Sequence, residues 1–429
     1  MANPPFNVDE VVVEKVKDDK KRLANSKRQY LANRGRDPTM QYKRLSEIAI
    51  SVQYGYTAQE TSQQGVYKYL RITDIVPYYP NFETVPYCAI DNDEAQKYLL
   101  SEGDIVIART GATTGYNFVV TKKIPPTVFA SYLIRFRVDE TQAYPKYIKY
   151  VLKSKPYYGF VANYVGGSAQ PGMGAKVFAR FPVPLPPLPT QRAIAEKLGR
   201  YDALIENNTR RIAILEAKAE QLYKEWFVRR RYPGHEKAKW IGGLPEGWRV
   251  EKIKNVVQRL PFGRTYKEKE LSSEGKVIVV DQSTKQWLGF HDDAPSHFAN
   301  AEKPIILFGD HSCKFQLMTQ DFSLGENVIP FIAEKKLNTY YLYYSVHRLI
   351  CTEEYKRHWG RLSAMKILIP SLDKQNSFAN IVTKHAALIL NLQRQNALLA
   401  KERDLLLPRL MSGKMAAADS LPTGQGVKP

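Results

Sequence analysis

The chain has 429 residues, a length that suggests two or more domains, each able to bury an apolar core. Its 63 Lys and Arg residues against 43 Asp and Glu residues give a formal net charge of +20, which favours a polyanionic partner, with nucleic acid first. Composition argues against a membrane or secreted protein, because no apolar run approaches the roughly 20 residues of a bilayer span and the N-terminus lacks the apolar core of a secretory signal. Three widely spaced cysteines fit a reducing compartment, so we expect a cytoplasmic protein.

The first half of the chain predicts a helix, a strand-rich domain and a second helix. Residues 1–40 read as a charged helical extension that ends at a Gly and Pro breaker. From 41 to 188 the pattern changes to short alternating runs, such as 66–72 and 132–138, which predict a mixed, strand-rich domain. A long helix is then predicted over 189–229.

That helix carries two interleaved series of residues that recur every seven positions, which is typical of a coiled coil. Asn208 is the polar interruption that can fix the register of two helices. An ordinary amphipathic helix packed on its own domain is the alternative. The residues that we expect to pack against a second helix are Leu198, Tyr201, Ile205, Asn208, Ile212, Leu215 and Leu222.

The second half of the chain repeats the first. A connector over 230–247 leads to a second strand-rich domain over 248–372, a second helix over 373–411 and a polar tail over 412–429. Gln191 and Gln375 each follow a proline-containing run, and the helices after them match at an offset of 184. In the second helix the expected packing residues are Ile389, Leu392, Leu399 and Leu406.

The two domain starts match at a different offset. Phe262 and Gly263 take the places of Tyr54 and Gly55, at an offset of 208. The first domain therefore carries about 24 more residues between the matched points, and the two domains have diverged in their middles.

Several motifs follow one another in the first domain. Residues 100–111 (LSEGDIVIARTG) form a predicted strand and loop, a glycine-rich loop follows over 166–171, and a proline-rich run leads into the helix that starts near Gln191. These motifs, in this order, resemble those of the specificity subunits of type I restriction-modification systems, in which the strand and loop belong to a target recognition domain. The second domain departs from these motifs, with Gly309-Asp310-His311-Ser312 and Gly360-Arg361-Leu362-Ser363-Ala364 at the corresponding places.

The resemblance implies an α+β fold of two tandem target recognition domains, separated by two long helices that form an antiparallel coiled coil. It also implies a subunit that reads a two-part sequence of double-stranded DNA with a fixed spacer. Two methylation subunits and two restriction subunits would be its partners. It implies no cofactor and no metal in this chain, and S-adenosylmethionine on the methylation subunits.

Helices of this length suit such a task. A helix of about 35 residues is roughly 50 Å long, and two packed helices are stiffer than any loop. Two reading domains held about one turn of DNA apart would face the same side of the duplex.

Candidate DNA-binding residues lie in the polar loops of both domains. Arg109 has the fork geometry that grips guanine or phosphate, and glycines next to it allow close approach. An ordinary glycine-containing turn with a solvated arginine is the alternative for this loop. The candidates are Arg109, Thr110, Gly111, Thr113, Thr114, Lys122, Lys123, Ser168 and Gln170 in the first domain, and Asp310, His311, Lys314, Arg361 and Ser363 in the second.

Two other functions compete with a sequence reader. Asn3-Pro4-Pro5-Phe6 is the tetrapeptide type with which amino-methylating DNA methyltransferases hold a flipped base, which makes a DNA-modifying enzyme the alternative. No Gly-x-Gly loop follows a strand in a βαβ context, so we interpret residues 1–40 as a remnant of a methylation gene or a start-site artefact. A basic scaffold without sequence preference would not require two different domains.

Overall fold

The computed structural model describes residues 41–411, apart from 59, 62–64, 77–79, 166–171, 284 and 352–356. The extension over 1–40 and the tail over 412–429 therefore lie outside the described residues. The described chain forms two compact units. The first unit contains residues 41–204 and 398–411, and the second contains residues 205–397.

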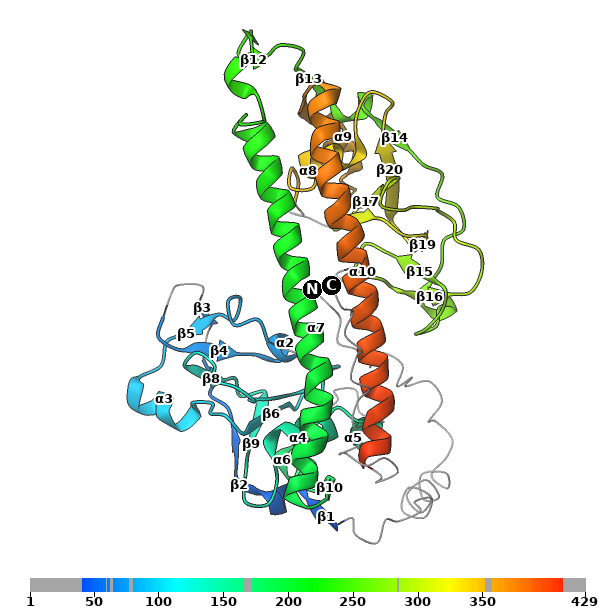
Figure 1. The fold of residues 1–429 in the computed structure, drawn as a ribbon. Coiled ribbons are helices and arrows are strands. Elements are labelled where there is room, and N and C mark those ends of the chain that lie inside the picture. The colour runs from blue at the N-terminus through cyan, green and yellow to red at the C-terminus, as the bar shows by residue number, and fades with distance from the viewer. Residues whose placement is uncertain are drawn as a thin grey trace, which may run out of the picture. The chain divides into compact units, whose positions relative to one another are not determined.

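The first unit is built around a sheet of order β2-β9-β6-β7, of which β2, β9 and β6 are labelled in Figure 1. Two apolar cores lie on its two faces. Alternate side chains of the buried strand β6 explain this layering. Ile105 and Ile107 join one core with the helices, whereas Val106 and Ala108 join another on the opposite face. A second sheet has the order β3-β5-β4-β8. The strands are β1 (Gln41–Arg44), β2 (Ala49–Tyr54), β3 (Glu60–Thr61), β4 (Lys68–Leu70), β5 (Tyr87–Cys88), β6 (Asp104–Ala108), β7 (Asn117–Val119), β8 (Thr127–Phe129), β9 (Leu133–Val138) and β10 (Pro182–Leu185).

Helices cover one face of this sheet, and short strands tie its ends together. Strand β1 pairs with β10 antiparallel, so the start and the end of the domain meet before the long helix α7 begins. The helices are η2 (Leu45–Ile48), α2 (Ile72–Ile75), α3 (Asn92–Tyr98), α4 (Pro145–Val151), α5 (Lys155–Val165), α6 (Ala175–Phe178) and α7 (Leu188–Tyr223).

The second unit repeats the topology. Its main sheet has the order β14-β20-β17-β18, a second sheet has the order β16-β15-β19, and β13 pairs with β21 as β1 does with β10. The strands are β11 (Trp240–Ile241), β12 (Leu244–Pro245), β13 (Arg249–Lys252), β14 (Val257–Arg259), β15 (Val277–Val280), β16 (Gly289–His291), β17 (Ile305–Gly309), β18 (Phe315–Met318), β19 (Phe322–Leu324), β20 (Val328–Ala333) and β21 (Lys366–Ile369). The helices are η3 (Lys224–Val228), η4 (His235–Lys237), η5 (Ile253–Asn255), η6 (Glu268–Glu270), α8 (Thr339–Val346), α9 (Trp359–Ala364) and α10 (Leu372–Met411).

The difference in length between the two domains is spread along the chain. The offset between equivalent strands is 208 from β1 to β13, 201 from β6 to β17, 195 from β9 to β20 and 184 from β10 to β21. Each step falls in a segment between strands that keep their place in the main sheet. These segments include short helices: α3, between β5 and β6, has no counterpart among the described residues between β16 and β17. The domain middles have therefore diverged in the segments that connect a constant main sheet.

In the first unit, an ion cluster joins the domain to both long helices. Asp202 of α7 accepts from Lys149 Nζ of α4 at 2.6 Å and from Arg403 Nη1 of α10 at 2.6 Å. Tyr150 Oη donates to the same carboxylate at 2.8 Å. All four side chains are buried, so the carboxylate holds three elements together away from water.

In the second unit the two long helices run antiparallel. Asn208 Nδ2 lies 3.4 Å from Gln395 Oε1, and further along α7 Phe227 of the following π-helical turn packs edge-on against Phe378, with ring centroids 5.4 Å apart. From the first pair to the second, the residue number rises along α7 and the following turn but falls along α10, as it does in antiparallel helices. Asn208, the expected polar interruption, therefore makes an interhelical contact to Gln395.

Helix burial follows the heptad series in part. Leu198, Tyr201, Asn208 and Leu392 are buried. The other expected packing residues are half-buried, because two helices alone leave much of each surface open: Ile205, Ile212, Leu215, Leu222, Ile389, Leu399 and Leu406. The fold class expected from the sequence, two tandem strand-rich domains with two long antiparallel helices, is confirmed.

Candidate nucleic-acid interface

Arg109 leaves the main sheet of the first unit directly after β6. Its N–H donates to the Tyr132 carbonyl at 3.0 Å, and its own carbonyl accepts from the N–H of Met173 at 2.8 Å. Thr110 forms an antiparallel bridge with Gly172. The backbone of this loop is thus fixed on both sides, by β9 and by the segment before α6.

The Arg109 side chain lies over an exposed aromatic ring. Its guanidinium carbon is 5.1 Å from the ring centroid of Tyr54, the last residue of β2. The Tyr54 hydroxyl accepts from the N–H of Ala175 at 3.1 Å, and the side chain is 43 % exposed. Arg109 Nε is buried and has no hydrogen-bond partner among the described residues. The arginine is therefore held by a cation–π contact, with hydrogen-bonding capacity unused.

The loop that follows is shaped by its glycines. Gly111 and Gly115 have φ of +74° and +90°, values that side chains with a Cβ rarely adopt. Thr114 is buried, and its hydroxyl donates to the Gly111 carbonyl at 2.7 Å, so it closes the turn. Thr113 is half-buried, whereas Gly111 at the loop tip is exposed.

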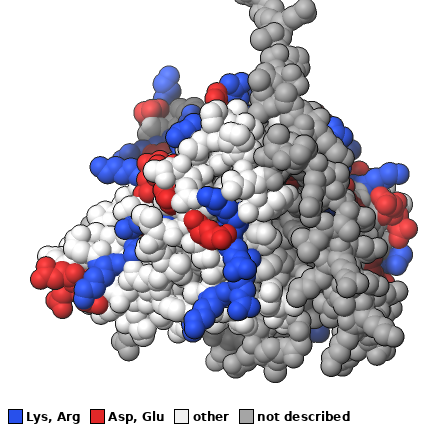
Figure 2. All heavy atoms as spheres, turned by 90° about the horizontal axis from the view of Figure 1, so that it is seen from below, with Lys and Arg blue, Asp and Glu red and all other residues white. Residues whose placement is uncertain are grey.

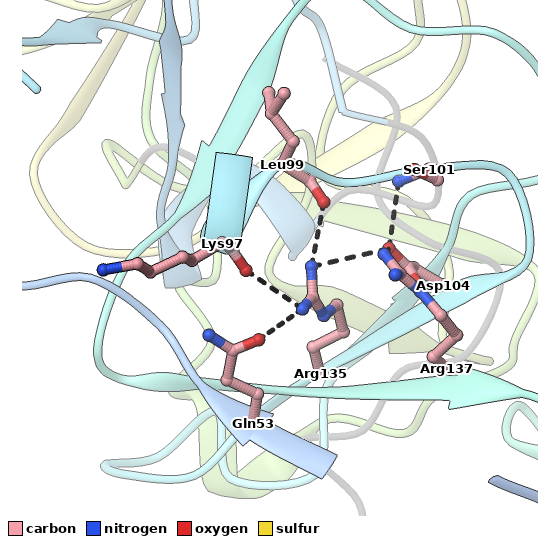
Figure 3. A network of polar contacts seen from close by, with 7 residues as sticks. All are labelled: Gln53, Lys97, Leu99, Ser101, Asp104, Arg135 and Arg137. Carbon is pink, nitrogen blue, oxygen red and sulfur yellow. Dashed lines mark hydrogen bonds and ion pairs between the residues drawn. The ribbon is translucent and has the colours of Figure 1, made fainter. Parts of the chain in front are cut away.

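A buried charge network supports the strand that carries Arg109 (Figure 3). Asp104, at the start of β6, accepts from Arg137 Nε at 2.8 Å and lies 3.8 Å from Arg135 Nη1. Arg135 also donates to the carbonyls of Leu99 at 2.8 Å and Lys97 at 3.1 Å. Burial lowers the pKa of Arg135, and the hydrogen bond to Asp104 raises that of Arg137. Arg135 is buried and Arg137 is half-buried, and both are held by Asp104, whereas Arg109 at the other end of β6 has no carboxylate partner among the described residues.

The remaining candidates of the first unit are dispersed. Lys122 and Lys123 are exposed after β7, and Ser168 and Gln170 lie outside the described residues. On the face drawn in Figure 2, Lys and Arg side chains are interspersed with Asp and Glu. On this face the distribution of charge therefore does not mark an interface. The contacts of individual side chains have to be compared instead.

In the second unit, Asp310 takes the backbone place of Arg109. It directly follows β17, and its carbonyl accepts from the N–H of His358 at 2.8 Å, just before α9. Its side chain points inward, however, where Oδ1 accepts from the N–H of Trp359 at 2.8 Å. Asp310 is buried and holds the start of α9, because those first N–H groups have no partner within the helix.

The other candidates of the second unit have mostly local contacts. Lys314 Nζ donates to the Ser283 carbonyl at 2.7 Å, and burial lowers the pKa of this lysine. The N–H of His311 donates to Gln282 Oε1 at 3.0 Å. Ser363 Oγ donates to the Gly360 carbonyl at 3.1 Å, and Arg361 is exposed on α9. Among the described residues, no group of three His, Cys, Asp or Glu could hold a metal ion.

The role of Tyr54 has no signal in the sequence. Tyr54 matches Phe262 at the start of the second domain, but a tyrosine in an alternating strand is unremarkable by itself. Its position at the end of an edge strand, 55 residues before Arg109, becomes informative only when the sheet brings β2 and β6 to either side of β9.

The fold defines a class of protein: tandem strand-rich domains carried on two long helices. Residues 38–217 match the family described as Type I restriction modification DNA specificity domain. The chain is similar to the specificity subunits of type I restriction enzymes over a longer stretch.

Relatives in one archaeon extend this similarity over most of the chain. The type I restriction enzyme MjaIX specificity subunit of Methanocaldococcus jannaschii is 25% identical over 298 residues, covering 63% of this chain and 69% of that protein. The putative type I restriction enzyme MjaX specificity subunit of the same organism is 21% identical and covers 87% and 93%. The crystal structure of a type I restriction-modification S subunit from M. genitalium has the same fold, with a TM-score of 0.53, 14% identity and coverage of 88% and 97%. Across the described residues, no helix is long and apolar enough to cross a membrane.

Proposed function

We propose that this chain is the non-catalytic subunit that selects a two-part DNA sequence with a fixed spacer. Each recognition domain reads one half, and the bases between the halves are passed over. The single observation that carries this proposal is the duplication: the order of the main sheet occurs twice, with the connecting segments around it changed. Two domains with the same main sheet and different connecting segments suit two different sequences.

In the first domain the reading group is Arg109, supported by the loop over 110–115. Its guanidinium rests on Tyr54 and has a buried Nε without a partner among the described residues. An arginine in this state is prepared for a guanine edge or a phosphate, and little rotamer freedom is lost on binding. Lys122 and Lys123 add phosphate contacts that do not depend on sequence.

The partners that carry out chemistry dock on the long helices. These helices expose large apolar side chains that water does not favour: Leu204, Leu398 and Leu405 in the first unit, and Ile214, Ile381 and Leu388 in the second. Such residues on a helix surface favour a protein partner. We assign these surfaces to the methylation subunits, which bring S-adenosylmethionine, and the restriction subunits join the same assembly.

The test is to map methylated bases in the DNA of cells that express this chain with its methylation subunit. The proposal predicts one two-part sequence with a constant spacer. A continuous short sequence, or methylation of the same sequence without this chain, would overturn it. Turnover of S-adenosylmethionine by the purified chain alone would favour the alternative of a DNA methyltransferase, which rests on Asn3-Pro4-Pro5-Phe6 in the part of the chain outside the described residues.

A further inference from the structure

The second domain has an arginine on an exposed aromatic ring, as the first domain does, but the arginine comes from a different strand. Phe262 stands at the offset of 208 from Tyr54 and is 42 % exposed, against 43 % for Tyr54. The guanidinium carbon of Arg259, the last residue of β14, lies 5.8 Å from the Phe262 ring centroid. Both domains therefore place a large, partly exposed aromatic ring at the same position, with an arginine over it.

A second aromatic ring also lies close to Arg259. Its guanidinium carbon is 5.6 Å from the ring centroid of Trp359, the first residue of α9. Trp359 is fixed by its N–H donating to Asp310 Oδ1 at 2.8 Å. Arg259 is exposed, and no carboxylate forms an ion pair with it among the described residues. Its charge is therefore unneutralised while its side chain is ordered.

The two arrangements use equivalent backbone positions. Ala175 begins α6 and Trp359 begins α9, at the offset of 184. In the first domain the Ala175 N–H fixes the Tyr54 hydroxyl. In the second, Asp310 occupies the place of Arg109 and fixes the Trp359 N–H instead. The residue that follows β17, Asp310, thus holds the start of α9, whereas the residue that follows β6, Arg109, lies over an aromatic ring. In the second domain the arginine over an aromatic ring is Arg259 of β14.

We infer that Arg259, which lies close to the rings of Phe262 and Trp359, is the DNA-contacting residue through which the second domain reads its half-site. This inference rests on the proposed function. A fork of donors over two aromatic rings fits a guanine edge, with Phe262 offering a stacking or packing face to a neighbouring nucleotide. Asp310 acts through Trp359 as a positioning residue.

The experiment measures binding of short duplexes by the full chain in complex with its methylation subunits. The probes carry the methylated two-part sequence, or that sequence with either half scrambled. Arg109→Ala identifies the half that the first domain reads, because scrambling that half should abolish the effect of this substitution. The remaining half is then assigned to the second domain. Arg259→Ala should weaken binding of the intact duplex about 10- to 100-fold, and should have no effect on a duplex in which the half assigned to the second domain is scrambled. Arg259→Lys, which keeps the charge and loses the fork, should recover only part of the affinity.

The matched control is Arg249→Ala, which removes an exposed arginine from β13 of the same domain. Equal weakening of every duplex by both alanine variants would show that Arg259 is only part of a general positive field, and would overturn the inference. Wild-type affinity in Arg259→Ala would also overturn it and leave the proposed function standing. If the wild-type complex bound scrambled and intact duplexes equally, both proposals would fall.

Discussion

Gln191 and Gln375 make the same pair of hydrogen bonds in the two units. Gln191 Oε1 accepts from the N–H of Tyr144 at 2.8 Å, and its Nε2 donates to the Pro186 carbonyl at 2.8 Å. Gln375 does the same with the N–H of Asn338 and the carbonyl of Pro370, both at 2.8 Å. In both units this buried amide joins the start of a long helix to the residue before α4 or α8.

We predict that Gln191→Leu and Gln375→Leu each lower the free energy of unfolding by about 1–3 kcal/mol, because each leaves a buried N–H and a buried carbonyl unsatisfied. Urea unfolding followed by circular dichroism measures this loss. Since the two residues lie in different units, the double variant should lose the sum of the two effects. An unchanged unfolding midpoint in both single variants would show that water replaces these hydrogen bonds at no cost.

Asp202→Asn should strongly destabilise the first unit. It would leave Lys149 and Arg403 buried without their carboxylate, and breaking a buried ion cluster from one side costs about 3–5 kcal/mol. Chemical unfolding of the purified chain measures this cost. Glu196→Gln is the matched control, since it removes an exposed carboxylate of α7 that pairs with Arg200 and should change stability little. Equal effects of the two substitutions would contradict the role given to Asp202.

We predict that the buried side chain of Lys153 makes the stability of the first unit depend on pH. Burial, then the charges of Lys149 and Arg403, lower the pKa of this lysine to about 7. Above pH 7 the folded chain therefore binds fewer protons here than the unfolded chain, whose lysine has a pKa near 10.4, so stability should rise with pH by up to about 1.4 kcal/mol per unit. Below pH 7 this term is constant and unfavourable.

Lys153→Met should remove that slope between pH 7 and pH 9 and make the chain more stable than the wild type at pH 7. Thermal unfolding across this range measures both effects. Parallel pH profiles for the two proteins would show that Lys153 keeps its ordinary pKa in the folded chain.

Asp104 starts β6 and Arg109 follows it, but substitutions of the two residues should affect different properties. One should change DNA affinity and the other the free energy of unfolding. Arg109→Ala should lower affinity for the target duplex by about 1–3 kcal/mol with little change in unfolding. Asp104→Asn should lower the free energy of unfolding by about 3–5 kcal/mol, because Arg135 would be buried without its carboxylate (Figure 3). Binding and unfolding measured on both variants test this separation, and a loss of stability in Arg109→Ala equal to that of Asp104→Asn would refute it.

The sequence predicted the repeat and the fold class because both rest on periodic apolar patterns, which local residues determine. The offset of 184 after Gln191 could be read directly from the chain. Contacts between distant residues could not. Arg403 meets Asp202 across 201 positions, and no local pattern announces such a pair.

The direction in which a side chain points could not be predicted from the sequence either. Asp310 could be placed after a strand in line with Arg109, but whether its carboxylate faces solvent or the start of α9 depends on the packing of α9. The sequence around Arg259 gives no signal for such a role, because this arginine ends a short strand, β14, with no glycine-rich loop beside it. The aromatic pair that makes it notable is assembled only in the fold.

The most direct test of the account is an exchange of one domain. Residues 248–372 are replaced with the matching domain of another family member, and methylated bases are mapped in cells that express the hybrid with the methylation subunit. One half of the recognised sequence should change, while the other half and the spacer length stay as they were, since the first domain and both long helices are untouched. A change in both halves, or in the spacer, would contradict the claim that each domain reads its own half.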